Sequence, residues 1–214
     1  MNNNYFNFND GNGPVLAHRH RNGGGWVADT AFVASTAYVG PNAMVCGNAK
    51  VHGNAKVDDY AKVLGDAWVY GDVKVCGSAI VGGKAEVYQN ATVCGNAIVY
   101  GDAWIYDDAK VSGDATVGDS ARVYQNAWVF GSARVSGNAE VFSHGEVREH
   151  AFVHGHAKIY GNADIFGSAV VGGRTWVCGK AKVSGHTFVC DNAHITGDAR
   201  VDGGVVQGKT FICA

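Results

Sequence analysis

A Val or an Ile stands at every sixth residue from Val27 to Val201, without one insertion or deletion. The count is (201 − 27)/6 + 1 = 30 aliphatic positions in strict register. Residues 45–51 show the repeated unit, which reads aliphatic, any residue, Gly, Asn or Asp, Ala, any residue. A short fixed period of this kind is typical of a repeat architecture and constrains the fold more than any other feature.

Each position of the unit favours a different part of a coil. The aliphatic residue alternates with two outward neighbours, as in a short strand. Two residues later the unit has Gly in 19 of 30 copies and then Asn or Asp in 15 of 30, and these residues tolerate positive φ and tight turns. The next residue is Ala in 25 of 30 copies, which suits a corner that points into a narrow interior.

Three straight segments and three bends close a triangular coil, so one coil consists of three repeat units. The sequence therefore predicts an all-β, single-domain parallel β-solenoid of about ten coils, roughly 48 Å long at the usual strand spacing. Residues 25–214 are expected to form the solenoid, with residues 210–213 as a last strand. Residues 1–24 are expected to form an N-terminal cap over the first coil, since stacked repeats need capping.

The repeated unit resembles that of the hexapeptide-repeat family, matching its pattern of aliphatic, Gly, two variable residues, a small residue and one variable residue over about 25–206. The resemblance implies a left-handed parallel β-helix. Known members include bacterial acyltransferases and γ-class carbonic anhydrases, mostly homotrimers. The many Gly-Asn/Asp-Ala units and the start at Gly24-Gly25-Trp26-Val27 are more similar to bacterial and phage hexapeptide proteins of unknown role.

Charge and hydropathy limit the expected partners. The chain has 17 basic and 19 acidic residues, which argues against a nucleic-acid or anionic-membrane surface. It has no apolar run long enough to be inserted in a membrane. The first residues, Met1 to Phe6, lack the pattern of a signal peptide, so we expect a cytoplasmic or virion-associated protein.

Six cysteines lie at positions 46, 76, 94, 178, 190 and 213, without the spacing of a zinc site. We interpret them as reduced strand residues. Cys76 and Cys94 are three repeat units apart and would stack on adjacent coils. A disulfide between them is the alternative, which we expect to require distortion of the strands.

Folding the chain at every third repeat unit separates three faces. The first, face 1, carries a contiguous apolar strip that we predict to be the self-association surface of a homotrimer. Its residues are Ile80, Ile98, Phe152, Val170 and Phe188. Gly82, Gly118 and Gly172 follow the aliphatic residue on this face, and we expect them to allow close approach of a partner. The alternative is a strip that stays partly exposed or is covered by the N-terminal segment.

The second face, face 2, carries an aromatic ladder with one ring per coil. The ladder comprises Tyr70, Tyr88, Tyr106, Tyr124, Phe142 and Tyr160, and Trp68 and Trp104 stand beside it. Stacking of aromatic residues in register would stabilise the coils. The alternative is a binding platform for sugar rings or for a partner protein. The third face, face 3, carries mainly charged residues such as Lys56 and Lys182 and is expected to be solvated.

The histidines do not predict a metal centre. His144, His150 and His156 recur once per repeat unit, so they lie on successive corners and point in different directions. The His-x4-His pair of the γ-class carbonic anhydrases is absent. We therefore predict no metal and no cofactor.

The sequence favours a non-catalytic structural or binding solenoid, a homotrimer with rigid faces for assembly or attachment in a phage particle or surface structure. The alternative, which rests on the resemblance, is an acyl-CoA-dependent O- or N-acyltransferase with active sites between subunits. His154 or His150 would then act as the base. Acyltransferases of the family usually have a loop extruded from a corner, whereas no insertion interrupts 27–201 here.

Overall fold

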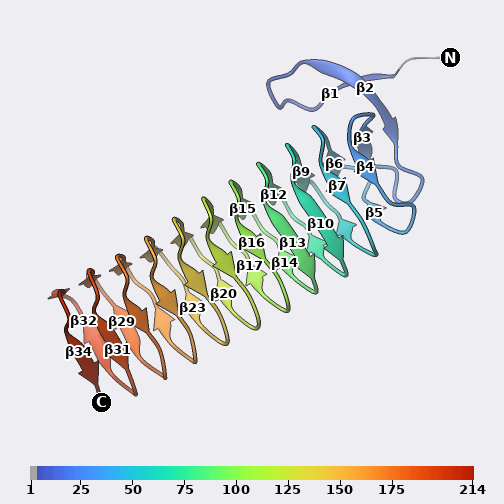
Figure 1. The fold of residues 1–214 in the computed structure, drawn as a ribbon. Coiled ribbons are helices and arrows are strands. Elements are labelled where there is room, and N and C mark those ends of the chain that lie inside the picture. Colours follow the sequence, from blue (N-terminus) through green and yellow to red (C-terminus); the bar gives the residue numbers. More distant parts are fainter. Residues whose placement is uncertain (1–3) are drawn as a thin grey trace.

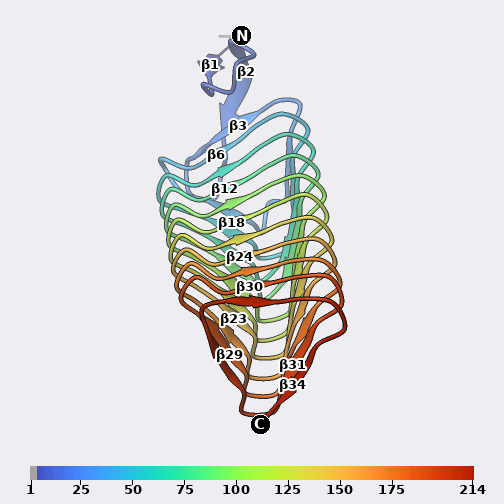
Figure 2. The same cartoon turned by 90° about the vertical axis from the view of Figure 1, so that its left-hand side faces the viewer.

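The computed structural model describes residues 4–214, so the first three residues of the predicted cap lie outside the described part. It is a parallel β-solenoid of about ten coils with three repeat units in each, which confirms the predicted fold class (Figure 1). Figure 2 shows the coils stacked one behind another. The left hand implied by the resemblance stays a prediction.

Each face is one sheet. Face 1 has thirteen strands: β1 (Tyr5–Asn7), β2 (Pro14–Arg19), β3 (Trp26–Ala28), β6 (Met44–Val45), β9 (Lys62–Val63), β12 (Ile80–Val81), β15 (Ile98–Val99), β18 (Thr116–Val117), β21 (Arg134–Val135), β24 (Phe152–Val153), β27 (Val170–Val171), β30 (Phe188–Val189) and β33 (Val205–Val206). Face 2 has eleven: β4 (Phe32–Val33), β7 (Lys50–Val51), β10 (Trp68–Gly71), β13 (Glu86–Gln89), β16 (Trp104–Ile105), β19 (Arg122–Val123), β22 (Glu140–Val141), β25 (Lys158–Ile159), β28 (Trp176–Val177), β31 (His194–Thr196) and β34 (Phe211–Cys213). Face 3 has ten: β5 (Tyr38–Val39), β8 (Lys56–Val57), β11 (Lys74–Val75), β14 (Thr92–Val93), β17 (Lys110–Val111), β20 (Trp128–Val129), β23 (Glu146–Val147), β26 (Asp164–Ile165), β29 (Lys182–Ser184) and β32 (Arg200–Asp202).

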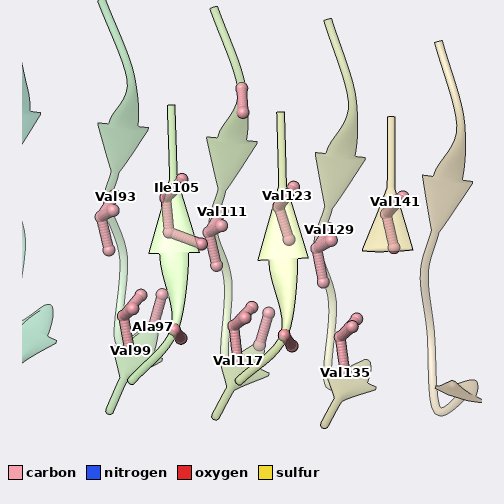
Figure 3. Packing of buried hydrophobic residues seen from close by; sticks show 14 of the residues in the cluster. Val93, Ala97, Val99, Ile105, Val111, Val117, Val123, Val129, Val135 and Val141 are labelled. Carbon is pink, nitrogen blue, oxygen red and sulfur yellow. The ribbon is translucent and has the colours of Figure 1, made fainter. Parts of the chain in front are cut away.

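The core consists of the aliphatic columns and the corner alanines (Figure 3). From Val39 to Ile195 every aliphatic residue of the repeat is at most 1% exposed. Parallel pairing joins each residue to its equivalent in the next coil, as Val75 joins Val93. A one-residue slip would turn these side chains outward, so burial of the columns fixes the register.

The corners explain why Gly is common and where it is replaced. From residue 47 onward the Gly position has positive φ in every unit, and eight units carry another residue there. In seven of these eight, the side chain accepts a hydrogen bond from the backbone N–H of the corresponding residue one coil on. The seven acceptors are Asp59, Gln89, Asp107, Asp119, Gln125, Glu149 and Asp191. This bond offsets part of the cost of the left-handed conformation.

The N-terminal segment extends one sheet and covers the edge of another. Strands β1 and β2 form an antiparallel hairpin, and β2 pairs antiparallel with β3 of the first coil (Figure 1). Phe8 is buried in a small cluster of its own with Ala17, Ala28 and Cys46. Further along, the N–H of Val39 donates to the carbonyl of Asn22, so this segment also covers the edge of β5.

At the C-terminal end of the described chain, β34 forms the predicted last strand. The coil before it is one residue shorter than the others, since Val189 pairs with Val206. Thr187 replaces the corner Ala at this point, and its hydroxyl accepts a hydrogen bond of 2.7 Å from the N–H of Gly203. The polar corner residue therefore accommodates the shortened coil.

The predicted state of two cysteines was wrong. Cys76 and Cys94 form a disulfide, with Cα atoms 4.6 Å apart. The strands are not distorted, because the N–H of Cys76 still donates to the carbonyl of Val93 at 2.9 Å. The ordinary spacing of paired strands, about 4.8 Å, already lies within the Cα range that disulfides accept.

Candidate functional site

The aromatic ladder on face 2 stacks ring upon ring, as predicted. Successive ring centroids are 4.9–5.0 Å apart and the ring planes differ by at most 6°. The four inner rings, from Tyr88 to Phe142, therefore have a neighbouring ring against each face. A sugar ring stacks on an aromatic face, and these faces are occupied. The binding role of the ladder stays a prediction. A ligand on the inner rings would have to contact their edges and hydroxyl groups.

The phenols of the ladder are held in their neutral form. Burial raises the pKa of Tyr88 to about 12. Burial also raises the pKa of Tyr124, whose hydroxyl donates to Glu140 at 3.0 Å. A hydrogen bond with Cys178 is the main cause that raises the pKa of Tyr160 to about 12. The ladder is thus uncharged over the physiological pH range.

Two tryptophans beside the ladder are covered by cations. The Lys50 ammonium lies 4.4 Å from the ring centroid of Trp68, and the Arg122 guanidinium lies 4.9 Å from that of Trp104. Cation–π contacts of this kind stabilise the surface of the sheet. Their role in binding stays a prediction.

The apolar strip on face 1 is not continuous, which corrects one expectation. Strands β18 and β21 carry Thr116 and Arg134 and lie between the two parts of the strip. Ile80 and Ile98 form one patch. Phe152, Val170 and Phe188 form a second patch on three successive strands. The interface prediction applies to two patches separated by two polar rungs.

The glycines on face 1 do not leave space for a partner, which corrects a second expectation. A side chain from the preceding coil already fills the space over each glycine. Leu64 lies over Gly82, Tyr100 over Gly118 and His154 over Gly172. On face 1, several large residues directly after the aliphatic residue are followed by a glycine at the same position of the next coil. A side chain that lies along the solenoid axis needs this empty position.

The two histidines proposed for acyl transfer lie at opposite ends of one strand. His154 packs on Phe152, with ring centroids 4.7 Å apart, and over Gly172. His150 is exposed at the preceding corner. The extended chain between the two spans roughly 13 Å. The structure does not bring them together within one chain, and their catalytic role stays a prediction.

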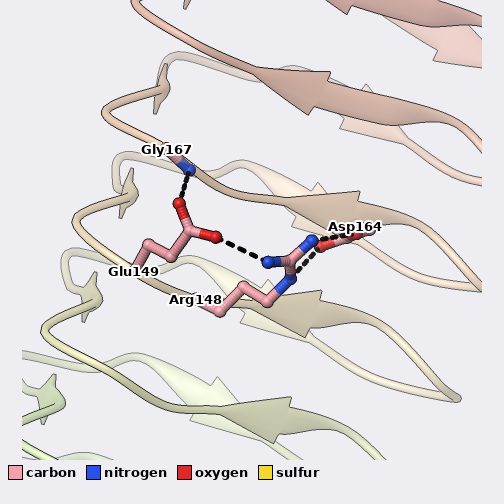
Figure 4. Close-up of polar contacts among 4 residues, drawn as sticks. All are labelled: Arg148, Glu149, Asp164 and Gly167. Atoms are coloured by element: carbon pink, nitrogen blue, oxygen red, sulfur yellow. Dashed lines mark hydrogen bonds and ion pairs between the residues drawn. The ribbon is translucent and has the colours of Figure 1, made fainter.

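One part of face 3 carries a polar network (Figure 4), whereas Lys56, Lys110 and Lys182 on the same face are exposed, as expected of a solvated face. The Arg148 guanidinium donates to Asp164 at 3.0 and 2.9 Å and to Glu149 at 2.6 Å. It also lies 4.2 Å from the ring centroid of Phe166. Glu149 accepts from the N–H of Gly167 at 3.0 Å, so the network joins neighbouring coils.

A surface hollow of about 320 Å³ lies where face 3 begins. It was missed by the sequence analysis. Its lining residues are Asn90, Asp108, Lys110, Asn126, Trp128, His144 and Glu146. The Trp128 indole is held in place by a hydrogen bond of 3.2 Å to Ser112 and by Phe130, whose ring centroid is 4.1 Å away. Trp128 is nevertheless 40% exposed.

A sequence signal for this hollow does exist. Four successive coils lack Gly at the corner between faces 2 and 3, where Gln89, Asp107, Gln125 and Ser143 stand instead. Each has positive φ, a conformation that costs free energy for residues other than Gly. Such a cluster of unfavourable conformations often marks a functional site.

Residues 4–214 contain no group of three or more side chains that could hold a metal ion. The same residues form no helix of the length and apolarity needed to cross a membrane. A second hollow of about 290 Å³ lies on face 1 between Tyr100, Arg134 and Phe152.

Comparison with known proteins supports the repeat architecture. A family model described as the YdcK beta solenoid repeat matches residues 91–107 and residues 157–173. The first segment begins on face 3 and the second on face 2, so the shared pattern is the six-residue unit rather than one face. No curated protein matches this chain. The chain is thus similar, over these two segments, to a known β-solenoid repeat.

Proposed function

We propose that this chain is a non-catalytic structural and binding β-solenoid that presents rigid faces for assembly or attachment to a protein or glycan. The observation that carries this proposal is the constant repeat of 4.9–5.0 Å along six stacked rings. A surface held so regularly offers a partner the same groups at fixed intervals. The relationship to hexapeptide-repeat proteins and a place in a phage particle or surface structure are further parts of the proposal.

Assembly as a homotrimer through face 1 is the second part of the proposal. The apolar patches on this face support it, because Ile98 is 38% and Phe188 is 43% exposed. Exposed apolar side chains grouped on one sheet are typical of interfaces.

Light scattering on the purified chain tests the trimer. We expect the mass of three chains, and we expect Phe188→Glu to give monomers because a charge would be buried in the interface. Trp176→Glu on face 2 is the matched control and should leave the trimer intact. A monomeric native chain would overturn the trimer while leaving the solenoid and its other faces unaffected.

A further inference from the structure

We infer that the hollow beside Trp128 binds one pyranose ring of a neutral glycan. This inference deepens the binding part of the proposed function and does not depend on the trimer. The hollow is distinct from the aromatic ladder, and it combines an exposed aromatic ring with polar side chains that have no partner among the described residues.

Trp128 supplies the apolar surface that the ladder lacks. Ser112 and Phe130 fix the indole, so binding costs little side-chain ordering. The exposed part of its ring borders the hollow. An aromatic face is electron-rich and attracts the weakly positive C–H groups on one side of a pyranose.

Polar side chains near the indole form two rows, one on the strands of face 3 and one at the corner between faces 2 and 3. Lys110 and Glu146 stand on the strands that pair with the Trp128 strand on either side. Asn126 and His144 stand at the adjoining corner. These four side chains form no hydrogen bond or ion pair with another described residue, so their donors and acceptors are free for hydroxyl groups.

The corner holds this polar row in place. Gln89 accepts from the N–H of Asp107, Asp107 from that of Gln125, and Gln125 from that of Ser143. This chain of bonds runs beside Asn126 and His144 and fixes their backbone. A rigid support behind the contacting groups is what a binding site requires.

Size and charge favour a single neutral ring. The volume of about 320 Å³ is at the lower end of the range for small-ligand pockets, about 300–1,000 Å³. Lys110 lines the hollow together with Asp108 and Glu146, so the lining has both signs of charge. Neither a phosphate nor a strongly cationic ligand is favoured by such a lining.

Fluorine NMR on protein labelled with 5-fluorotryptophan tests the inference, since each of the five tryptophans gives its own resonance. The probes are glucose, galactose, mannose and N-acetylglucosamine, with glucuronate and glucosamine as charged counterparts. We expect at least one neutral sugar to shift the Trp128 resonance saturably, with Kd of about 1 mM for a ligand of this size. The Trp68, Trp104 and Trp176 resonances should stay in place.

Substitutions sharpen the test. Trp128→Phe identifies the resonance by removing it, and Asn126→Ala should weaken binding by at least about fivefold through the loss of a hydrogen bond. Trp176→Phe is the control, because Trp176 is 42% exposed but lies on face 2. No saturable shift with any neutral sugar, a shift only with a charged sugar, or a shift at Trp68 or Trp104 instead would each overturn the inference.

Discussion

Faces 1 and 2 fill the same position of the repeat, directly after the aliphatic residue, in two different ways. On face 2, aromatic rings stand one above another, 4.9–5.0 Å apart, in six successive coils. On face 1, Leu64, Tyr100 and His154 lie over glycines of the following coil. The rise of one coil accommodates a ring that is parallel to its neighbours, whereas a side chain lying along the axis needs an empty position next to it. The ladder is therefore cooperative and the Gly contacts are local.

The largest expected effect follows from the pKa values of the ladder. Unfolded tyrosines lose their protons near pH 10, whereas burial and hydrogen bonding raise the pKa values of Tyr88 and Tyr160 to about 12. Between these values the unfolded state binds fewer protons than the folded state, so stability falls as pH rises.

Because several rings contribute, we expect this loss to exceed that of any single substitution on either face. Absorbance of the phenolate at increasing pH, recorded together with circular dichroism, measures it. Ionisation of all nine tyrosines near pH 10 with the fold intact would contradict the cooperative ladder.

A central interruption of the ladder should have the next largest effect. Tyr106→Ala removes stacking on both Tyr88 and Tyr124, and we expect it to destabilise the protein by about 2–3 kcal/mol. Tyr106→Phe keeps the ring and serves as the control. Hydrogen exchange of the amides in the adjoining coils reports the change locally, and equal protection in both variants would show that the rings contribute little.

The smallest expected effect is on face 1. Gly118→Val should cost about 1 kcal/mol, because its side chain would displace the Tyr100 ring into solvent. In a Tyr100→Ala background the same change should cost nearly nothing, since the space is then empty. A double-mutant cycle by thermal unfolding measures this coupling. Additive effects would mean that Tyr100 does not occupy the position over Gly118.

These contrasts also show how far a sequence predicts such a molecule. The period places Val75 on Val93 and Tyr88 on Tyr106, because in-register stacking requires no information beyond spacing. The direction in which a surface side chain lies depends on the space left by the next coil. For that reason the sequence at Gly118 suggests room for a partner, whereas the Tyr100 ring fills that space. The Cys76–Cys94 disulfide needs no distortion of the strands, because the spacing of paired strands already suits a disulfide.

The hollow at Trp128 depends on tertiary detail of the same kind. Its indole bonds Ser112 in the preceding coil and rests on Phe130 beside its own strand, and neither contact follows from the period. The repeat does not predict the N-terminal hairpin either, because residues 4–24 have no six-residue pattern from which pairing could be inferred. For the hollow at Trp128, the sequence offers one signal, which is the loss of Gly at four successive corners between faces 2 and 3.

The uniform coil has a consequence for the gene. Each coil pairs only with its two neighbours and every coil rises by the same step, so duplication or deletion of the coding segment for one coil preserves all three faces. The ladder would gain or lose one rung, and no corner would change. A change of a single residue has to be absorbed locally instead, as in the coil between Val189 and Val206, which is one residue shorter and is accommodated at Thr187. Unequal recombination can therefore lengthen or shorten this protein by whole coils while the remaining coils keep their register.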